Sequence, residues 1–134
     1  MSASAELQKA ILDHLLADPA VSGLIGDRLY DGAPKDAPYP HAEFGPSDFV
    51  PERGTCLTSR VETLQIDVWA RDAGRKRICG TVVDAMHAAL DDTAIPIAAP
   101  YRIVTLEASG RTMPDPDGIT WHGIVTVTAE VETR

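Results

Sequence analysis

Apolar side chains occupy alternate positions over residues 119–133 of the chain. The even positions are mostly Thr, His and Glu, whereas the odd positions are mostly apolar: Ile119, Trp121, Val125, Val127, Ala129 and Val131. Because successive side chains of a β-strand point to opposite faces of a sheet, this pattern predicts a strand with one buried and one wet face. A sheet of such strands has to bury its apolar face against a second layer.

Residues 56–90 show a change of apolar spacing that predicts a second long strand followed by a helix. Apolar residues alternate with polar residues over 64–68, so a strand is expected over 56–70. The alternation changes phase near Glu62, which suits a bulge or burial on both faces. From residue 72 to residue 90 the apolar residues recur at helical spacing, and this helix is expected to pack on the sheet.

The N-terminal part of the chain predicts a further helix and then a long loop. Residues Glu6–Ala17 carry apolar side chains at three- and four-residue steps, with Ser4 as the expected N-cap. A short helical turn is expected over 21–25. Five prolines lie within residues 31–51, so we expect a loop there with at most a brief edge strand over 41–44.

The order of the predicted elements defines the fold class. A third strand is expected over Tyr101–Ser109, and the turn Pro114–Gly118 joins it to the last strand. We therefore expect one domain over residues 1–134, of class α+β: a mainly antiparallel sheet with two principal helices packed on one face.

The charge balance limits the partners that the chain can have. Its formal net charge is -8, whereas a nucleic-acid grip relies on clustered Lys and Arg. Tight DNA binding is not expected. The charge is still compatible with an acidic wall past which DNA moves without adhering. No stretch reaches the length of a membrane span and the N-terminus lacks a signal-peptide pattern, so neither membrane association nor export is expected.

No combination of residues points to catalysis, a metal or a cofactor. The four histidines form no close pair with ligand spacing, and Cys56 and Cys79 belong to no CxxC pair, so both are expected to be reduced. Asp115 and Asp117 lack the other ligands of a calcium loop and are interpreted as turn-formers. Trp69 and Trp121 favour packing over ligand stacking. The basic run over residues 71–77 favours a solvated helix face over contacts with phosphates or acidic partners.

Four segments, taken in order, resemble a known family. They are Leu7-Gln-Lys-Ala-Ile-Leu-Asp-His-Leu-Leu-Ala-Asp-Pro-Ala-Val, Gly26-Asp-Arg-Leu-Tyr-Asp-Gly-Ala-Pro, Leu64-Gln-Ile-Asp-Val-Trp-Ala-Arg and Asp115-Pro-Asp-Gly-Ile-Thr-Trp-His-Gly. Together they are similar to the phage tail-completion proteins, and they cover nearly the whole chain. Each segment alone could occur in many proteins, and the resemblance rests on the occurrence of all four segments in this order. The chain departs from the family at Ala70, where relatives often carry Ser.

The resemblance implies a structural role in a virion or phage-like particle, in a phage, a prophage or a gene transfer agent. Such proteins form a ring, typically six-fold, that stacks on the last ring of the tail-tube protein and receives the head-side connector or stopper. The implied partners are other copies of the chain, these two proteins, and DNA that passes without sequence-specific binding. The alternatives are a head-completion or stopper protein of the same joint and a small cytosolic ligand-binding module.

Three groups of residues are the candidates for these contacts. The predicted loop over residues 45–55 is the first candidate for an arm that reaches a partner, through Phe49, Glu52 and Arg53. The turn that carries Asp115 and Asp117 is the second. The wet face of the last strand is the candidate lining of a channel, through Glu130 and Glu132.

Overall fold

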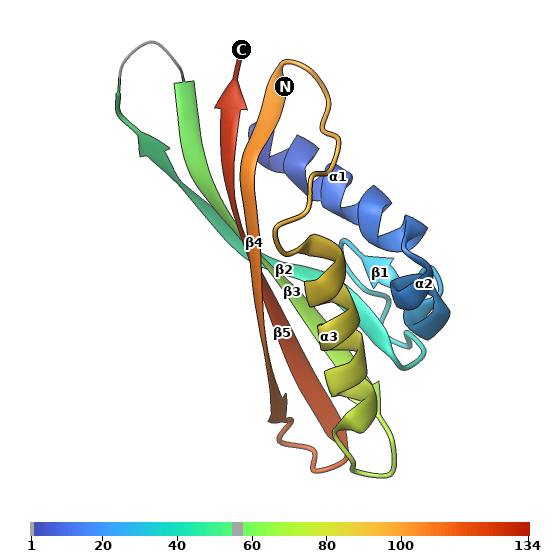
Figure 1. The fold of residues 1–134 in the computed structure, drawn as a ribbon. Coiled ribbons are helices and arrows are strands. Elements are labelled where there is room, and N and C mark those ends of the chain that lie inside the picture. Colours follow the sequence, from blue (N-terminus) through green and yellow to red (C-terminus); the bar gives the residue numbers. More distant parts are fainter. Residues whose placement is uncertain (1, 55–57) are drawn as a thin grey trace.

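Five strands form one sheet in the order β1-β2-β3-β5-β4 in a computed structural model that describes residues 2–54 and 58–134 (Figure 1). The elements in chain order are α1 (Ala3–Ala17), α2 (Pro19–Ile25), β1 (Leu29–Tyr30), β2 (His41–Glu52), β3 (Thr58–Arg71), α3 (Arg77–Leu90), β4 (Tyr101–Pro114) and β5 (Thr120–Thr133). The short strand β1 runs parallel to β2, and all other pairs are antiparallel. The predicted antiparallel sheet is thus confirmed, with one parallel pair at its edge.

All three helices lie on one face of the sheet (Figure 1). The even positions of β3 and the odd positions of β5 face these helices and form most of the core with them. The prediction that the helices pack on one face of the sheet is confirmed. A third helix, α2, takes the place of the expected helical turn. No helix within residues 2–54 and 58–134 combines the length and the apolar content that crossing a membrane requires.

The N-terminal helix begins earlier than the sequence indicated. Ser2, not Ser4, is the N-cap of α1, and its hydroxyl accepts a hydrogen bond from the Ala5 amide at 3.2 Å. Ser4 lies inside the helix and donates to the carboxylate of Glu62. The prediction of Ser4 as the N-cap was wrong. The Ser4 hydroxyl bonds to the Glu62 side chain of the sheet instead of to a backbone amide of its own helix.

Strand β2 is the main departure from the predicted fold. Residues 45–52 belong to this strand rather than to a loop. Because β1 pairs only with Ala42 and Glu43, the rest of β2 lies at the edge of the sheet. At an edge the missing N–H of a proline can face outward, where it breaks no hydrogen bond within the sheet. Pro46 lies at a bulge, where the register against β3 shifts between Phe44 and Ser47. The prolines were therefore weaker evidence against a strand than we assumed.

Strands β3 and β4 also differ in detail from the prediction. The pairing of β3 with β5 is continuous from Thr58 to Arg71, so a bulge, which was one of the two explanations given for the phase change near Glu62, is absent from this strand. The phase change arises because Glu62 faces the helices, where its residue is only 2% exposed. Residues 56 and 57 of the predicted strand lie outside the described residues. Strand β4 continues to Pro114, beyond the predicted end at Ser109.

Two glycines allow α3 to lie close to the sheet. A Cβ built on Gly123 of β5 would lie 2.6 Å from Val83 Cγ2 and 3.0 Å from Cys79 Sγ. A Cβ built on Gly110 of β4 would lie 2.5 Å from Val83 Cγ1. The helix therefore packs directly against the backbone of both strands, without a gap between α3 and the sheet at these two glycines.

Candidate interaction surfaces

The β2–β3 arm, defined here as residues 47–54 and 58–61, carries two of the exposed apolar side chains. Its strands extend away from the helical layer (Figure 1). Phe49 is 48% exposed and Val50 is 62% exposed. Phe49 lies on the helix-facing side of the strand and Val50 on the opposite side, because successive side chains alternate. Adjacent exposed apolar residues on a projecting hairpin are a common feature of contact sites.

A buried network fixes the base of the arm to α1. The guanidinium of Arg60 lies 3.7 Å from the centre of the Phe49 ring and 2.7 Å from the carboxylate of Glu62. The hydroxyl of Ser4 donates to Glu62 at 2.8 Å and accepts from Arg60 at 3.0 Å. The buried carboxylate is thus both paired and hydrogen-bonded, as a charge in this position requires. The direction of the arm is therefore coupled to the first turn of α1.

The face of the sheet opposite the helices carries more acidic than basic side chains toward the end with the arm. Glu52 accepts a hydrogen bond from Ser59 at 3.1 Å and lies close to Glu130. The negative charge of Glu52, followed by burial, raises the pKa of Glu130 above its ordinary value. Glu132 is only 7% exposed and lies 3.9 Å from Arg102 and 3.7 Å from Arg134. Of the two predicted channel-lining residues, Glu130 is thus the more available.

The turn between β4 and β5 is built around Asp117. Its carboxylate accepts from the amides of Ile119 and Thr120 at 2.9 and 2.8 Å, and from the hydroxyl of Thr120 at 2.5 Å. These bonds, the one from the hydroxyl foremost, lower the pKa of Asp117. The side chain is a turn-former, as predicted. Asp115 makes only a long contact to the Asp117 amide, at 3.5 Å, and so keeps most of its capacity to bind.

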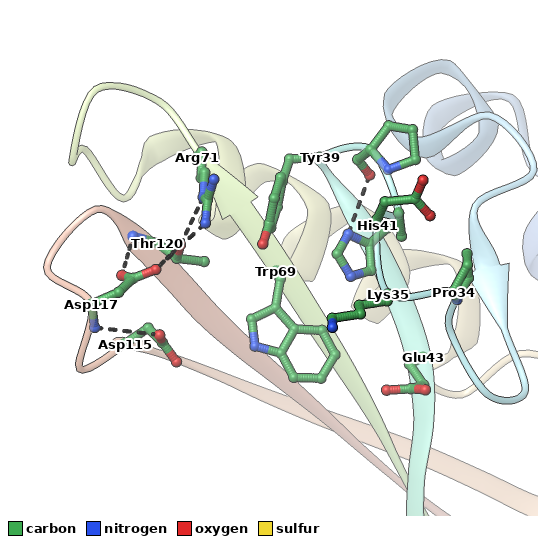
Figure 2. A pocket seen from close by; sticks show the side chains of 13 residues that line it. Pro34, Lys35, Tyr39, His41, Glu43, Trp69, Arg71, Asp115, Asp117 and Thr120 are labelled. Atoms are coloured by element: carbon green, nitrogen blue, oxygen red, sulfur yellow. Dashed lines mark hydrogen bonds and ion pairs between the residues drawn. The ribbon is translucent and has the colours of Figure 1, made fainter.

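A hollow of about 660 Å³ lies between this turn, the end of β3 and the loop before β2 (Figure 2). Its lining includes Asp115 and Asp117 together with Tyr39, Trp69 and Arg71. Figure 2 shows the Arg71 side chain between the turn and the Tyr39 ring, whose centre is 4.3 Å from the guanidinium. The second predicted contact site thus opens onto an aromatic surface that the sequence did not reveal.

Three aromatic rings form a row across the sheet beside this hollow. Trp69 of β3 lies between His41 of β2 and His122 of β5, with ring centres 5.7 and 4.9 Å apart. The rings of Trp69 and His122 are parallel within 4°. Asp67 binds the Nε2 atom of His122 at 2.7 Å, and burial lowers the pKa of His41. The Trp69 ring thus packs between two histidine rings and also lines the hollow.

The thiol of Cys79 is not poised for chemistry. Cys79 is buried and free, and burial raises its pKa to about 11, so the reactive thiolate is scarce at neutral pH. Cys56 lies outside the described residues. Within residues 2–54 and 58–134 no group of three or more His, Cys, Asp or Glu side chains is arranged to hold a metal ion.

Comparisons with known proteins identify one family and several similar folds, two of which are described here. A family model described as "Tail completion protein gp17" matches residues 9–132. The fold is similar to a chain in "Virion of native gene transfer agent (GTA) particle", with a TM-score of 0.85, 22% identity and 98% coverage of both chains. It is also similar to "Structure of bacteriophage SPP1 gp17 protein", with a TM-score of 0.52, 23% identity and coverage of 95% of this chain and 89% of that chain. No curated protein matches the chain.

Proposed function

Because the chain belongs to the Tail completion protein gp17 family, which is structural rather than enzymatic, we propose that it forms a ring that closes the tail tube and joins it to the head. The observation that carries the proposal is the family match over residues 9–132, which spans all eight elements of the fold except the first residues of α1 and the last residue of β5. The similar fold of a chain from a gene transfer agent virion supports a place in such a particle.

Deletion of the gene tests this function most directly. Electron microscopy of lysates should show tails of uncontrolled length together with heads that lack tails, and a plasmid copy should restore normal particles. Joined particles of normal tail length in the deletion strain would refute the proposal. The alternative, a stopper on the head side of the joint, predicts tailless heads together with free tails of normal length.

We place the contact with the tail-tube protein or the head-side connector on the β2–β3 arm. Phe49 supplies an exposed ring that Arg60 holds in place, and Glu52 and Arg53 supply charges at the same end. A preorganised aromatic side chain gives contact area at a low entropic cost. The variant Arg53→Glu should lower the yield of joined particles, whereas Arg75→Glu, an equal charge change in the loop before α3, should not. Equal yields from the two variants would remove the arm from the joint.

The β4–β5 turn and the acidic face have separate proposed roles. Asp115, which its own turn leaves largely unbound, is the second contact candidate, and Asp117 shapes the turn that presents it. Glu130 and Glu132 would make the channel wall weakly adhesive for DNA, because like charges repel. The double variant Glu130→Gln and Glu132→Gln should slow DNA ejection. Unchanged ejection kinetics would remove these two residues from the channel.

A further inference from the structure

The sheet has two long edges without a partner strand in the described part of the chain. Strand β4 is the last strand on one side, and β2 lies at the other side for all residues beyond Glu43. An unpaired edge presents backbone N–H and C=O groups that can bind another strand. Which groups are presented depends on the alternation of hydrogen bonds along each strand.

On β4 the outward backbone groups belong to the even-numbered residues. The Leu106 carbonyl accepts from the Asp92 amide at 2.9 Å, and the Ala108 amide donates to the Asp91 carboxylate at 2.9 Å. Both bonds point away from β5, so Gly110 and Thr112 also face outward. The turn after α3 thus covers the middle of the edge. The segment from Ser109 to Pro114 is uncovered by any described residue.

On β2 the same reasoning identifies the outward groups beyond the bulge. The Ala42 amide donates to the Arg28 carbonyl at 2.8 Å, on the outer side of the strand. The bulge adds one residue between Phe44 and Ser47, so the outward positions change from even to odd numbers. Ser47 and Phe49 therefore face outward, and no described residue binds their amides.

The prolines of the two edges agree with this assignment. Pro51 of β2 and Pro114 of β4 both fall on outward positions, where a missing N–H breaks no bond inside the sheet. Each edge thus has two free amides followed by a proline. The two free segments also match in length, so each residue of one segment can face a residue of the other.

We propose that the segment Ser109–Pro114 of one copy pairs in an antiparallel manner with the segment Ser47–Glu52 of the next copy. This inference rests on the proposed ring. Because β2 and β4 run in opposite directions in the sheet, copies placed side by side in one orientation bring these edges together antiparallel. The two surfaces differ from each other, and such head-to-tail contacts generate a ring when the rotation between successive copies closes.

Hydrogen bonds and charge together favour one register of this pairing. With Phe49 opposite Thr112, all four free amides meet carbonyl groups and Arg111 lies between Asp48 and Glu52 on one face. A shift by two residues in one direction would place Glu52 opposite Glu107, where like charges destabilise a pair. A shift by two residues in the other direction would place the amides of Ser47 and Gly110 opposite residues 116 and 53, which lie outside the two strands. Gly110 has no side chain and that of Thr112 is small.

There is space beside α1 for the incoming strand. A hollow of about 530 Å³ lies between α1 and β2, and Ser47, Leu7 and Leu12 contribute to its lining. The side chain of Thr112, which is on the helix-facing side of the incoming strand, would lie toward it, and α3, which covers Gly110 in its own copy, would come to lie beside α1. The added strand would therefore extend both the sheet and the layer of helices.

A disulfide between copies tests the register. In the proposed pairing Val50 lies opposite Arg111, so Val50→Cys with Arg111→Cys, in a Cys56→Ser background, should form a ladder of linked copies when purified particles are oxidised. Within one copy the two positions are three strands apart, and Arg111 lies six residues along β4 from Thr105, the residue level with Val50. This separation far exceeds the reach of a disulfide. The matched control, Val50→Cys with Met113→Cys, is displaced by two residues and should stay monomeric. Particles that contain the first variant only as monomer would overturn the proposal.

Charge reversal provides a second, independent test. Arg111→Glu should lower the yield of tailed particles by about tenfold or more, because it places a third acid between two others. Adding Asp48→Arg should restore the yield, and Arg75→Glu is the charge-matched control. Unchanged yield from Arg111→Glu, or no rescue by Asp48→Arg, would overturn the pairing. A deletion strain with normal particles would refute the proposed function instead, and the disulfide ladder would still decide whether the copies pair.

Discussion

Substitution of Gly123 by alanine should destabilise the protein although the change adds only one methyl group. The new Cβ would lie 2.6 Å from Val83 Cγ2 and 3.0 Å from Cys79 Sγ. Val83 is buried and β-branched, so its side chain has one strongly preferred rotamer in a helix and cannot turn away freely. The strain has to be relieved by moving α3 away from the sheet.

The expected magnitude is the difference between two opposing effects. Overpacking a core by one methylene costs about 1 to 3 kcal/mol, and replacing glycine within a strand recovers about 0.5 to 1 kcal/mol of backbone entropy. The net loss should be about 0 to 2.5 kcal/mol, centred near 1 kcal/mol, which lowers the melting temperature of a domain of this size by up to about 10 °C. Thermal and urea unfolding, followed by circular dichroism, measure both quantities.

Two further variants make this prediction decisive. Gly80 lies in α3, where an added Cβ meets nothing within 4 Å, so Gly80→Ala should raise stability by about 0.5 to 1 kcal/mol. Val83→Ala alone should lower stability, but combined with Gly123→Ala it should cost at least about 1 kcal/mol less than the sum of the two single changes. A stabilising Gly123→Ala, or strict additivity with Val83→Ala, would refute the reasoning about close approach.

Three other changes should have measurable effects. Glu62→Ala leaves the partly buried Arg60 unpaired and should lower the free energy of unfolding by about 2 to 4 kcal/mol in urea titrations, and an unchanged value would mean that the pair is dispensable. Because its hydrogen bonds lower the pKa of Asp117, the ionised form stabilises the fold, so Asp117→Ala should be less stable than the parent at neutral pH and the gap should shrink as the pH falls below 3.8. Because Glu52 raises the pKa of Glu130, the folded state favours the protonated form and loses stability as the pH rises above 4.5; Glu130→Gln should therefore be more stable than the parent at pH 7 and similar at pH 4.

Much of the fold could be predicted because the evidence was local. The alternation over residues 119–133 corresponds to β5 in the structure. The helical spacing over 72–90 corresponds to α3, which begins only at Arg77, so the predicted start of this helix was five residues too early. Only residues 41–44 of strand β2 were predicted, because the prolines of residues 45–52 oppose a strand unless that strand lies at an edge. Strand β2 lies at the edge beyond Glu43 because it pairs with β3 on one side and the short strand β1 covers only two of its residues on the other.

The candidate sites divide in the same way. The role of Asp117 as a turn-former is a local property of the segment Pro114–Gly118, and the structure has these hydrogen bonds. The row formed by His41, Trp69 and His122 could not be found from sequence, because its members come from three strands whose register was unknown. Their spacing in the chain carries no signal of contact.

The sequence by itself determined the periodicity of the strands and helices, the acidic balance and the order of segments that the tail completion family shares. Tertiary structure decided the order of strands, the inward direction of Glu62 and the close contact of α3 with Gly110 and Gly123. The physical reason is that alternation depends on neighbours one or two residues away, whereas a cross-strand partner depends on the register of the whole sheet. The two free edges, on which the proposed assembly depends, exist only once that register is set.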